Sequence, residues 1–158
     1  MHNLMDLALL KKVVLFEGLT SHQLQKISDL AVTRHFDGSE YIFREGDPGT
    51  AMYVIADGKV RISKMVPGVG EEALAILEKG QYFGEMALIE ERGPRSADAI
   101  AHTPCTLWVL DREKFDQLLF TDKDLAYVIL WTFVRTLSER LRETNDKIKG
   151  FFVLSRFG

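Results

Sequence analysis

Apolar residues recur at helical spacing near the start of the chain. Segment 1–31 carries two such series, which are Leu4, Leu7 and Leu10, followed by Leu24, Ile27 and Leu30. A spacing of three residues keeps side chains on one face of a helix, so this segment is predicted to form N-terminal helices. Thr20 and Gln23 fit a capping box, which predicts that the second helix begins there.

The pattern changes in segment 32–111 to short apolar runs separated by turn residues. The turns recur about every ten residues, at Asp37-Gly38, Asp47-Pro48-Gly49, Asp57-Gly58, Pro67-Gly68-Val69-Gly70 and Lys79-Gly80. About eight short strands in a segment of this length are typical of two sheets folded together as a jelly-roll-like β-roll. The predicted fold is therefore mainly β with flanking helices.

Asp57-Gly58 gives the strongest local signal within this β segment. It lies between Met52-Tyr53-Val54-Ile55 and Lys59-Val60-Arg61-Ile62. A type I′ turn needs positive φ at both central residues, and Asp-Gly tolerates that conformation well. We therefore expect a two-residue hairpin between these two strands.

Helical spacing returns in segment 112–158. Asp111 or a neighbour is expected to cap a helix that turns Phe115, Leu118 and Leu119 toward the roll. A longer helix follows, with residues alternating in steps of four and three at Leu130, Val134, Leu137, Leu141, Thr144, Ile148 and Phe151. This spacing is that of a coiled-coil seam.

The seam predicts a homodimer in which two parallel copies of the 130–151 helix pair about a two-fold axis. Such a helix could instead pack its narrow stripe on its own roll. We expect Ile129, Trp131 and Phe133 to serve that side, which leaves the seam free for a second copy. Thr144 is polar within this seam and could act as a register device.

Composition narrows the function classes. The 158 residues suit one compact domain with an appendage, and the net charge of −3 argues against a protein that coats nucleic acid. The single cysteine, Cys105, allows no internal disulfide and fits a reducing compartment. No apolar run is long enough to span a membrane, and the N-terminus resembles no signal peptide. We expect a cytoplasmic protein without membrane insertion.

Catalytic and DNA-binding patterns are not evident either. The four histidines, His2, His22, His35 and His102, are scattered without metal-ligand spacing, so no metal site is expected. No nucleophile elbow is present, and we expect no enzyme activity. A helix-turn-helix would require more chain after the long helix, so direct DNA binding is not expected.

The richest chemistry lies in segment 82–101. Gly84 permits close backbone approach, and a helical turn opening at Glu85, Met86 and Ala87 would direct N–H groups at an anion. Arg95 supplies a guanidinium that can hold two phosphate oxygens, and the Ser96 hydroxyl can donate to the same group. The Glu85 carboxylate, an acceptor, suits a ribose hydroxyl. The simpler alternative is a glycine turn with an incidental ion pair between Glu85 and Arg95.

The spacing Phe-Gly-Glu-Met-Ala-Leu, six residues, then Arg-Ser-Ala resembles the phosphate-binding cassette of the cyclic-nucleotide-binding domain family, found in bacterial catabolite activators and in regulatory subunits of cyclic-nucleotide-dependent kinases. The resemblance covers about residues 10–150, so 1–31, 32–111 and 112–158 are expected to form one such domain. It implies ligand contacts by Gly84, Glu85, Met86, Ala87, Arg95 and Ser96.

The resemblance also implies dimerisation through the long helix and base contacts from its polar side chains. Thr144 and Asn145 are the candidates for these contacts, although an ungapped alignment through Phe115 places Arg140 and Leu141 there instead. Asp98 stands where many members of the family carry a neutral residue, and we expect its side chain to point away from the site.

The predicted function is that of a cyclic-nucleotide sensor that acts on an unidentified partner protein in trans. In the kinase branch of the family a hydroxyl after the arginine is associated with guanine recognition, yet bacterial activators carry Ser there and respond to cyclic AMP. Ser96 therefore leaves cyclic GMP open, and cyclic AMP is favoured. The alternative is a ligand-free interaction module that retains the fold.

Overall fold

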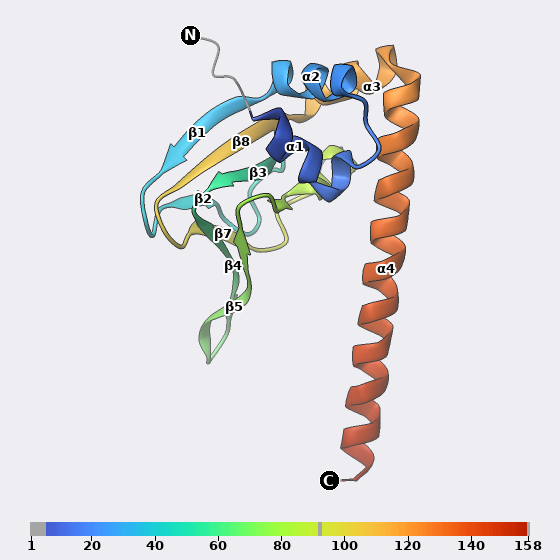
Figure 1. Ribbon diagram of the computed structural model, residues 1–158. Helices are drawn as coiled ribbons and strands as arrows, with labels where there is room; N and C mark the ends of the chain where they lie inside the picture. The colour runs from blue at the N-terminus through green and yellow to red at the C-terminus, as the bar shows by residue number, and fades with distance from the viewer. Residues whose placement is uncertain (1–5, 92, 158) are drawn as a thin grey trace.

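Eight β-strands form two four-stranded antiparallel sheets in the computed structural model, which describes residues 6–91 and 93–157 (Figure 1). One sheet has the order β1-β8-β3-β6 and the other β2-β7-β4-β5. The strands are β1 (Val32–Phe36), β2 (Tyr41–Phe43), β3 (Ala51–Asp57), β4 (Lys59–Val66), β5 (Gly70–Glu78), β6 (Tyr82–Phe83), β7 (Asp98–Ala101) and β8 (Cys105–Asp111). The predicted β-roll with flanking helices is confirmed.

The hairpin predicted at Asp57-Gly58 is wrong. β3 and β4 lie in different sheets, so these residues form the corner at which the chain crosses between sheets. Gly58 has φ +82°, whereas Asp57 is not among the described non-glycine residues with positive φ. A Cβ on Gly58 would lie 2.3 Å from the Pro104 carbonyl oxygen. Glycine is needed here because the chain passes close to Pro104 as it crosses from one sheet to the other. An Asp-Gly dipeptide is therefore compatible with a hairpin within one sheet and with a corner between two sheets.

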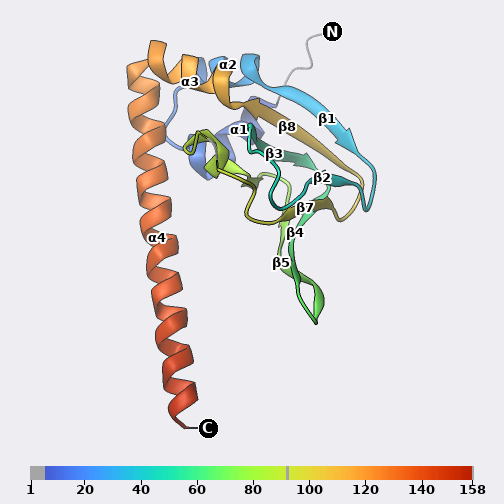
Figure 2. The ribbon, with the colours of Figure 1, turned by 180° about the vertical axis from the view of Figure 1, so that it is seen from behind.

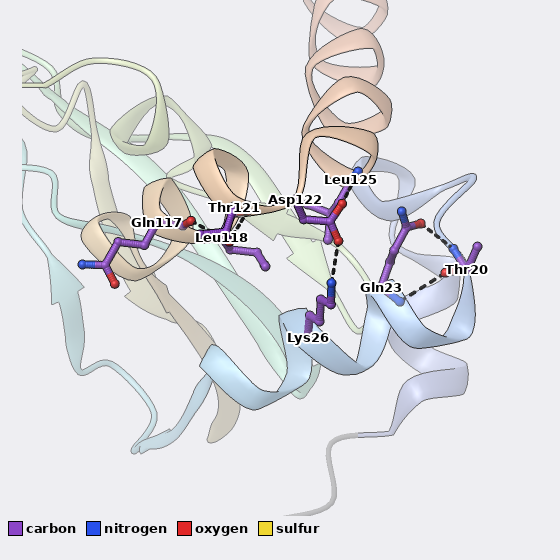
Figure 3. Close-up of polar contacts among 8 residues, drawn as sticks. All are labelled: Thr20, Gln23, Lys26, Gln117, Leu118, Thr121, Asp122 and Leu125. Carbon is purple, nitrogen blue, oxygen red and sulfur yellow. Dashed lines mark hydrogen bonds and ion pairs between the residues drawn. The ribbon is translucent and has the colours of Figure 1, made fainter.

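Short helices precede the roll. They are α1 (Leu7–Lys12), the 3₁₀ turn η1 (Val14–Phe16) and α2 (Ser21–Leu30). The predicted capping box is confirmed, because the Gln23 N–H donates to Thr20 Oγ1 at 3.2 Å and the Thr20 N–H to Gln23 Oε1 at 2.9 Å (Figure 3). Leu4 and His2 lie outside the described residues.

Two apolar clusters hold the fold together. The larger one joins the N-terminal helices to the sheet that contains β3 and β8, with Leu10, Leu15, Phe16 and Ile27 fully or almost fully buried. The smaller one lies between the two sheets and includes Cys105. Burial raises the pKa of the Cys105 thiol, which fits a packing role for this side chain.

Two helices follow the roll, α3 (Arg112–Thr121) and α4 (Lys123–Arg156). Asp111 caps α3 by accepting the Lys114 N–H at 3.2 Å, as predicted. Asp122 caps α4 by accepting the Leu125 N–H at 3.0 Å, and its other oxygen accepts the Lys26 ammonium of α2 at 2.7 Å (Figure 3). One carboxylate thus starts the long helix and ties it to the N-terminal helices.

α4 has 34 residues and is about 51 Å long. Its first part packs against the roll side of the molecule, with Leu125, Ala126, Ile129 and Phe133 buried, whereas its second part extends past the roll (Figures 1 and 2). The prediction that Trp131 packs on the roll is wrong, because this residue is 55% exposed. It lies on the side of the helix away from Ile129 and Phe133.

The predicted seam residues are exposed along α4, namely Leu130, Val134, Leu137, Leu141, Thr144, Ile148 and Phe151. The seam therefore does not pack on the roll of its own chain. Across the described residues, none of the helices combines the length and apolar character that crossing a bilayer requires.

Candidate functional site

Gly84 opens the site with a left-handed backbone conformation, φ +73°. It precedes the 3₁₀ turn η2 (Glu85–Leu88), whose first internal hydrogen bond runs from the Ala87 N–H to the Gly84 carbonyl at 3.1 Å. The N–H groups of Glu85 and Met86 precede that bond and have no acceptor inside the turn. A Cβ on Gly84 would lie 2.8 Å from Nη1 of Arg95, so glycine leaves the space that the arginine occupies.

Arg95 is held from several sides. Its Nη2 donates to the Ala51 carbonyl at 2.7 Å and its Nη1 to the Gly84 carbonyl at 3.3 Å. Its own backbone N–H donates to the Asp47 carbonyl at 2.7 Å, and its carbonyl accepts from the Gly46 N–H at 2.9 Å. The position of Arg95 is therefore determined by the backbone of β3, of η2 and of the turn before β3.

An aromatic cluster lies beneath the guanidinium of Arg95. Its Cζ is 4.2 Å from the centroid of the Phe43 ring and 5.7 Å from that of Tyr53. Tyr53 stacks on Phe83 of the neighbouring strand at 5.0 Å. The cation–π contacts stabilise the charge of Arg95. The sequence pattern did not predict them, because Phe43 and Tyr53 come from two separate strands, β2 and β3.

Arg95 is only 7% exposed, and within the described part of the chain its Nε has no hydrogen-bond partner. Burial lowers the pKa of the Arg95 guanidinium, while Tyr53, Asp47 and Glu85 oppose that change. An arginine remains protonated even so. A buried cation with an unused N–H donor favours binding of an anion.

Glu85 is 8% exposed and forms an ion pair with Arg140 of α4, with 2.5 Å between Oε1 and Nη1. Burial lowers the pKa of Arg140, but its hydrogen bond to Glu85 and the charge of Glu85 outweigh this, and the net pKa is raised. The alternative of an incidental Glu85–Arg95 pair is therefore not what the structure has. Glu85 instead links the cassette to the long helix.

A cavity of about 440 Å³ lies over these groups. Its polar end includes Arg95 and Ser96, Arg140 stands at its α4 side, and Ile62, Ala75 and Leu77 of β4 and β5 provide an apolar wall. All six predicted cassette residues line it, namely Gly84, Glu85, Met86, Ala87, Arg95 and Ser96. A cavity with a buried cation at one end and apolar walls fits a small anion that carries an apolar or aromatic part.

The structure does not bring Thr144 or Asn145 to this cavity. Both are exposed on α4, and the Thr144 hydroxyl donates to the Arg140 carbonyl at 2.9 Å. Arg140, which the ungapped alignment placed at the base position, is the α4 residue that reaches the cavity rim. Contact of Thr144 and Asn145 with a ligand stays a prediction.

Asp98 does not line the cavity. Its Oδ1 accepts the Glu45 N–H at 2.7 Å, so this carboxylate fixes the turn before β3. This agrees with the expectation that its side chain points away from the site. Within residues 6–91 and 93–157, no three His, Cys, Asp or Glu side chains gather in a way that could hold a metal ion.

Comparison with known proteins identifies the family of this chain. The model of the cyclic nucleotide-binding domain matches residues 33–122, which is more than half of the chain. The chain belongs to this family. The matched segment runs from β1 to the start of α4 and contains the whole cassette.

Relatives of the chain span both nucleotide classes. The chain is 38% identical over 112 residues to the cGMP-dependent protein kinase egl-4 of Caenorhabditis briggsae, covering 70% of this chain and 15% of the kinase. It is 35% identical over 131 residues to the cyclic AMP receptor protein of Thermus thermophilus, covering 83% of this chain and 58% of that protein. The chain thus spans only part of each relative's length.

Among solved structures, the N-terminal domain of a transcriptional regulator from Streptomyces coelicolor A3(2) is similar with a TM-score of 0.78 and 29% identity. The similarity covers 89% of this chain and 94% of that one. The similarity of fold to that structure therefore extends beyond residues 33–122, the segment that the family model matches.

Proposed function

We propose that this cyclic-nucleotide-binding domain is a sensor of cyclic AMP that acts on a partner protein in trans. The observation that carries the proposal is the Arg95 side chain, which lines the cavity, is almost fully buried and has an Nε without a partner among the described residues. Its guanidinium supplies the positive charge and the N–H donor that a cyclic phosphate needs.

The proposed ligand lies with its phosphate at Arg95 and Ser96 and its ribose at Glu85. The N–H groups at the start of η2, including that of Met86, add donors beside the phosphate, while Gly84 and Ala87 keep the backbone close. The base then extends along the apolar wall or toward α4, where Arg140, Thr144 and Asn145 are the polar candidates.

One argument supports cyclic AMP over cyclic GMP. The cyclic AMP receptor protein of Thermus thermophilus aligns with a larger share of this chain than the C. briggsae kinase does. Ser96 fits both ligands, because bacterial activators that respond to cyclic AMP carry Ser after the arginine and a hydroxyl there is associated with guanine recognition in the kinase branch. The kinase relatives keep cyclic GMP as the competing ligand.

The Glu85–Arg140 ion pair provides a route from the site to the partner. A ribose hydroxyl that hydrogen-bonds Glu85 must share this carboxylate with Arg140 or displace it. Either change alters the attachment of α4 to the cassette, so ligand binding shifts the preferred position of the helix. The proposal includes a parallel homodimer through 130–151, supported by the exposed seam.

The proposed role is regulatory and non-enzymatic, without a metal cofactor. A cytoplasmic location is part of the same proposal. It is supported by the single buried thiol of Cys105, whose raised pKa fits a reduced packing residue.

The deciding experiment is calorimetric titration of nucleotide-free protein with cyclic AMP and with cyclic GMP. We expect saturable binding of about one nucleotide per chain, tighter for cyclic AMP. Arg95→Ala should abolish binding and keep the circular-dichroism spectrum of the fold. Ser63→Ala is a suitable control, because Ser63 is buried and its hydroxyl has no hydrogen-bond partner among residues 6–91 and 93–157, but it does not line the cavity.

Tighter binding of cyclic GMP would overturn the ligand assignment and keep the sensor. Failure of both nucleotides to bind folded protein would overturn the sensor itself. It would favour an interaction module that uses the exposed apolar end of α4, where Phe151, Phe152 and Leu154 are exposed.

A further inference from the structure

Trp131 is an exposed aromatic side chain within the part of α4 that otherwise packs on the roll. It is 55% exposed, although Ile129 and Phe133 on either side of it are buried. The roll of its own chain therefore does not cover this indole. Trp131 adjoins the exposed Tyr127 and Leu130 on the helix surface, and a contiguous exposed apolar patch of this kind marks an interaction site.

A groove is lined by residues of α3 and of the first turns of α4, two helices that follow one another at one end of the molecule (Figure 1). Its lining includes Phe120, Lys123, Ala126, Tyr127 and Leu130. Phe120 is 75% exposed and Tyr127 is 69% exposed, and the Lys123 ammonium lies 4.4 Å from the centroid of the Phe120 ring. The groove is mainly apolar, and its lining also includes one acidic and one basic residue, Asp116 and Lys123.

The groove is continuous with the seam of α4. Tyr127 precedes Leu130 by three residues, so the alternation of three and four extends upward from Leu130 into the groove. In heptad notation Tyr127, Val134 and Leu141 occupy a positions, and Leu130 and Leu137 occupy d positions. Ala126 then falls at g and Trp131 at e.

In a parallel pair of helices, a g residue of one copy lies against the following e residue of the other. Ala126 of one copy therefore faces Trp131 of the second copy. Ala126 lines the groove and has a small side chain, so it leaves room for an indole between Phe120 and Tyr127. The register, the free indole and the groove all specify the same contact.

We propose that the groove between α3 and α4 receives Trp131 of a second copy of this chain, so that α3 takes part in the dimer interface. This rests on the homodimer of the proposed function and extends it from a seam of one helix to a contact between two elements. The two-fold axis gives each dimer two such contacts. Aromatic residues that fill a pocket are the usual anchors of an interface.

The first test is sedimentation of the full chain over a range of concentrations, with and without cyclic AMP. We expect Trp131→Ala to raise the dimer dissociation constant by about 30-fold or more, as expected for an anchor residue. Trp108→Phe is the control, because Trp108 is buried in the core and lies outside the groove. It should leave dimerisation unchanged.

The second test is a charge exchange between the two sides of the contact. Trp131→Glu and Phe120→Lys should each abolish the dimer, whereas an equimolar mixture should form a heterodimer. In that heterodimer one groove receives the native indole and the other pairs Glu with Lys. A dimer that forms in the mixture but in neither variant by itself would show that the contact joins two different chains.

A wild-type dimer with an unchanged dissociation constant in Trp131→Ala would overturn the groove contact and leave a dimer through the seam. A chain that is monomeric at every concentration would overturn both. Nucleotide titration of the same samples is a separate readout, so failure of the sensor proposal is recognised independently.

Discussion

The two walls of the cavity hold their arginines in different ways. Arg95, on the cassette wall, is buried and bonded to the Ala51 and Gly84 carbonyls of the roll. Arg140, on the helix wall, has a side chain that is 52% exposed and is paired with the Glu85 carboxylate. The first is preorganised by backbone, and the second is attached through an ion pair.

This difference separates binding from response. A preorganised cation supplies affinity because no side chain must be reordered when the anion arrives. Arg140 is half-exposed whereas its partner Glu85 is buried, so the ion pair can be exchanged only if a ligand hydroxyl keeps the Glu85 carboxylate hydrogen-bonded. The cassette wall therefore suits capture of the phosphate, and the helix wall suits reporting its presence.

Among substitutions that compare the two walls, the largest expected effect comes from Arg95→Lys. A lysine keeps the charge but cannot donate to two carbonyls and also to a phosphate with the planar fork of arginine. We expect affinity for cyclic AMP to fall by about 100-fold or more, measured by calorimetric titration. Arg140→Lys is the matched substitution on the helix wall. Equal losses in the two variants would contradict the contrast between the walls.

A second prediction concerns the space that Gly84 leaves for Arg95. In Gly84→Ala the new Cβ would lie 2.8 Å from Arg95 Nη1, so the guanidinium must shift. We expect about a tenfold or greater loss of affinity, together with a stability cost of about 1 kcal/mol from the positive φ.

Gly68→Ala is the control for that substitution. Gly68 also has positive φ, +79°, but a Cβ added to it would meet no atom within 4 Å. It should show a similar loss of stability in thermal unfolding and unchanged affinity. Loss of affinity in both variants would mean that backbone strain, and not displacement of Arg95, weakens binding.

Arg140→Ala should have a smaller effect on affinity, about tenfold or less, because the phosphate contacts remain. Its main effect should be on the response of α4. In wild type, ligand should change amide hydrogen exchange along 134–150, and this change should be lost in the variant. Arg142→Ala, on the same helix and outside the cavity lining, should retain it. A retained response in Arg140→Ala would show that another contact couples the helix to the site.

The same contrast explains how much of the site could be predicted from the sequence. The cassette residues from Gly84 to Ser96 are close together in the chain, so their spacing alone predicted that they would line one site, and all six predicted residues do line one cavity. Phe43 and Tyr53 lie beneath Arg95 but come from distant strands, and no local pattern marks them. On the helix, the cavity contact depends on how α4 rotates against the roll, which sequence spacing leaves open between Arg140 and Thr144.

The fold shows a similar division. Alternating short strands predicted the roll, and capping patterns at Thr20 and Asp111 predicted helix starts, because these signals are local. Asp57-Gly58 was misinterpreted because a turn signal does not say whether the next strand pairs with the last one or crosses to the other sheet. Trp131 was misplaced although helical spacing separates it from Ile129 and Phe133, because residues two apart lie about 200° apart around a helix.

The smallest expected effect concerns the attachment of the helix wall at its upper end. The hydrogen bond from Lys26, and then that from the Leu125 N–H, lower the pKa of Asp122. Because the folded pKa lies below the ordinary value of 3.8, this carboxylate contributes stability above that pH and loses the contribution as pH falls through the lowered pKa. Asp122→Ala should therefore lower the unfolding temperature slightly at pH 7, and the difference from wild type should shrink below pH 3.8, as measured by circular dichroism.

Asp124→Ala, in the first turn of the same helix but outside the cap, should show a smaller difference at neutral pH. Affinity for cyclic AMP should stay unchanged in both variants, because Asp122 lies outside the cavity. A loss of affinity in Asp122→Ala would mean that the position of α4 contributes to capture of the phosphate, and the two walls would then act together.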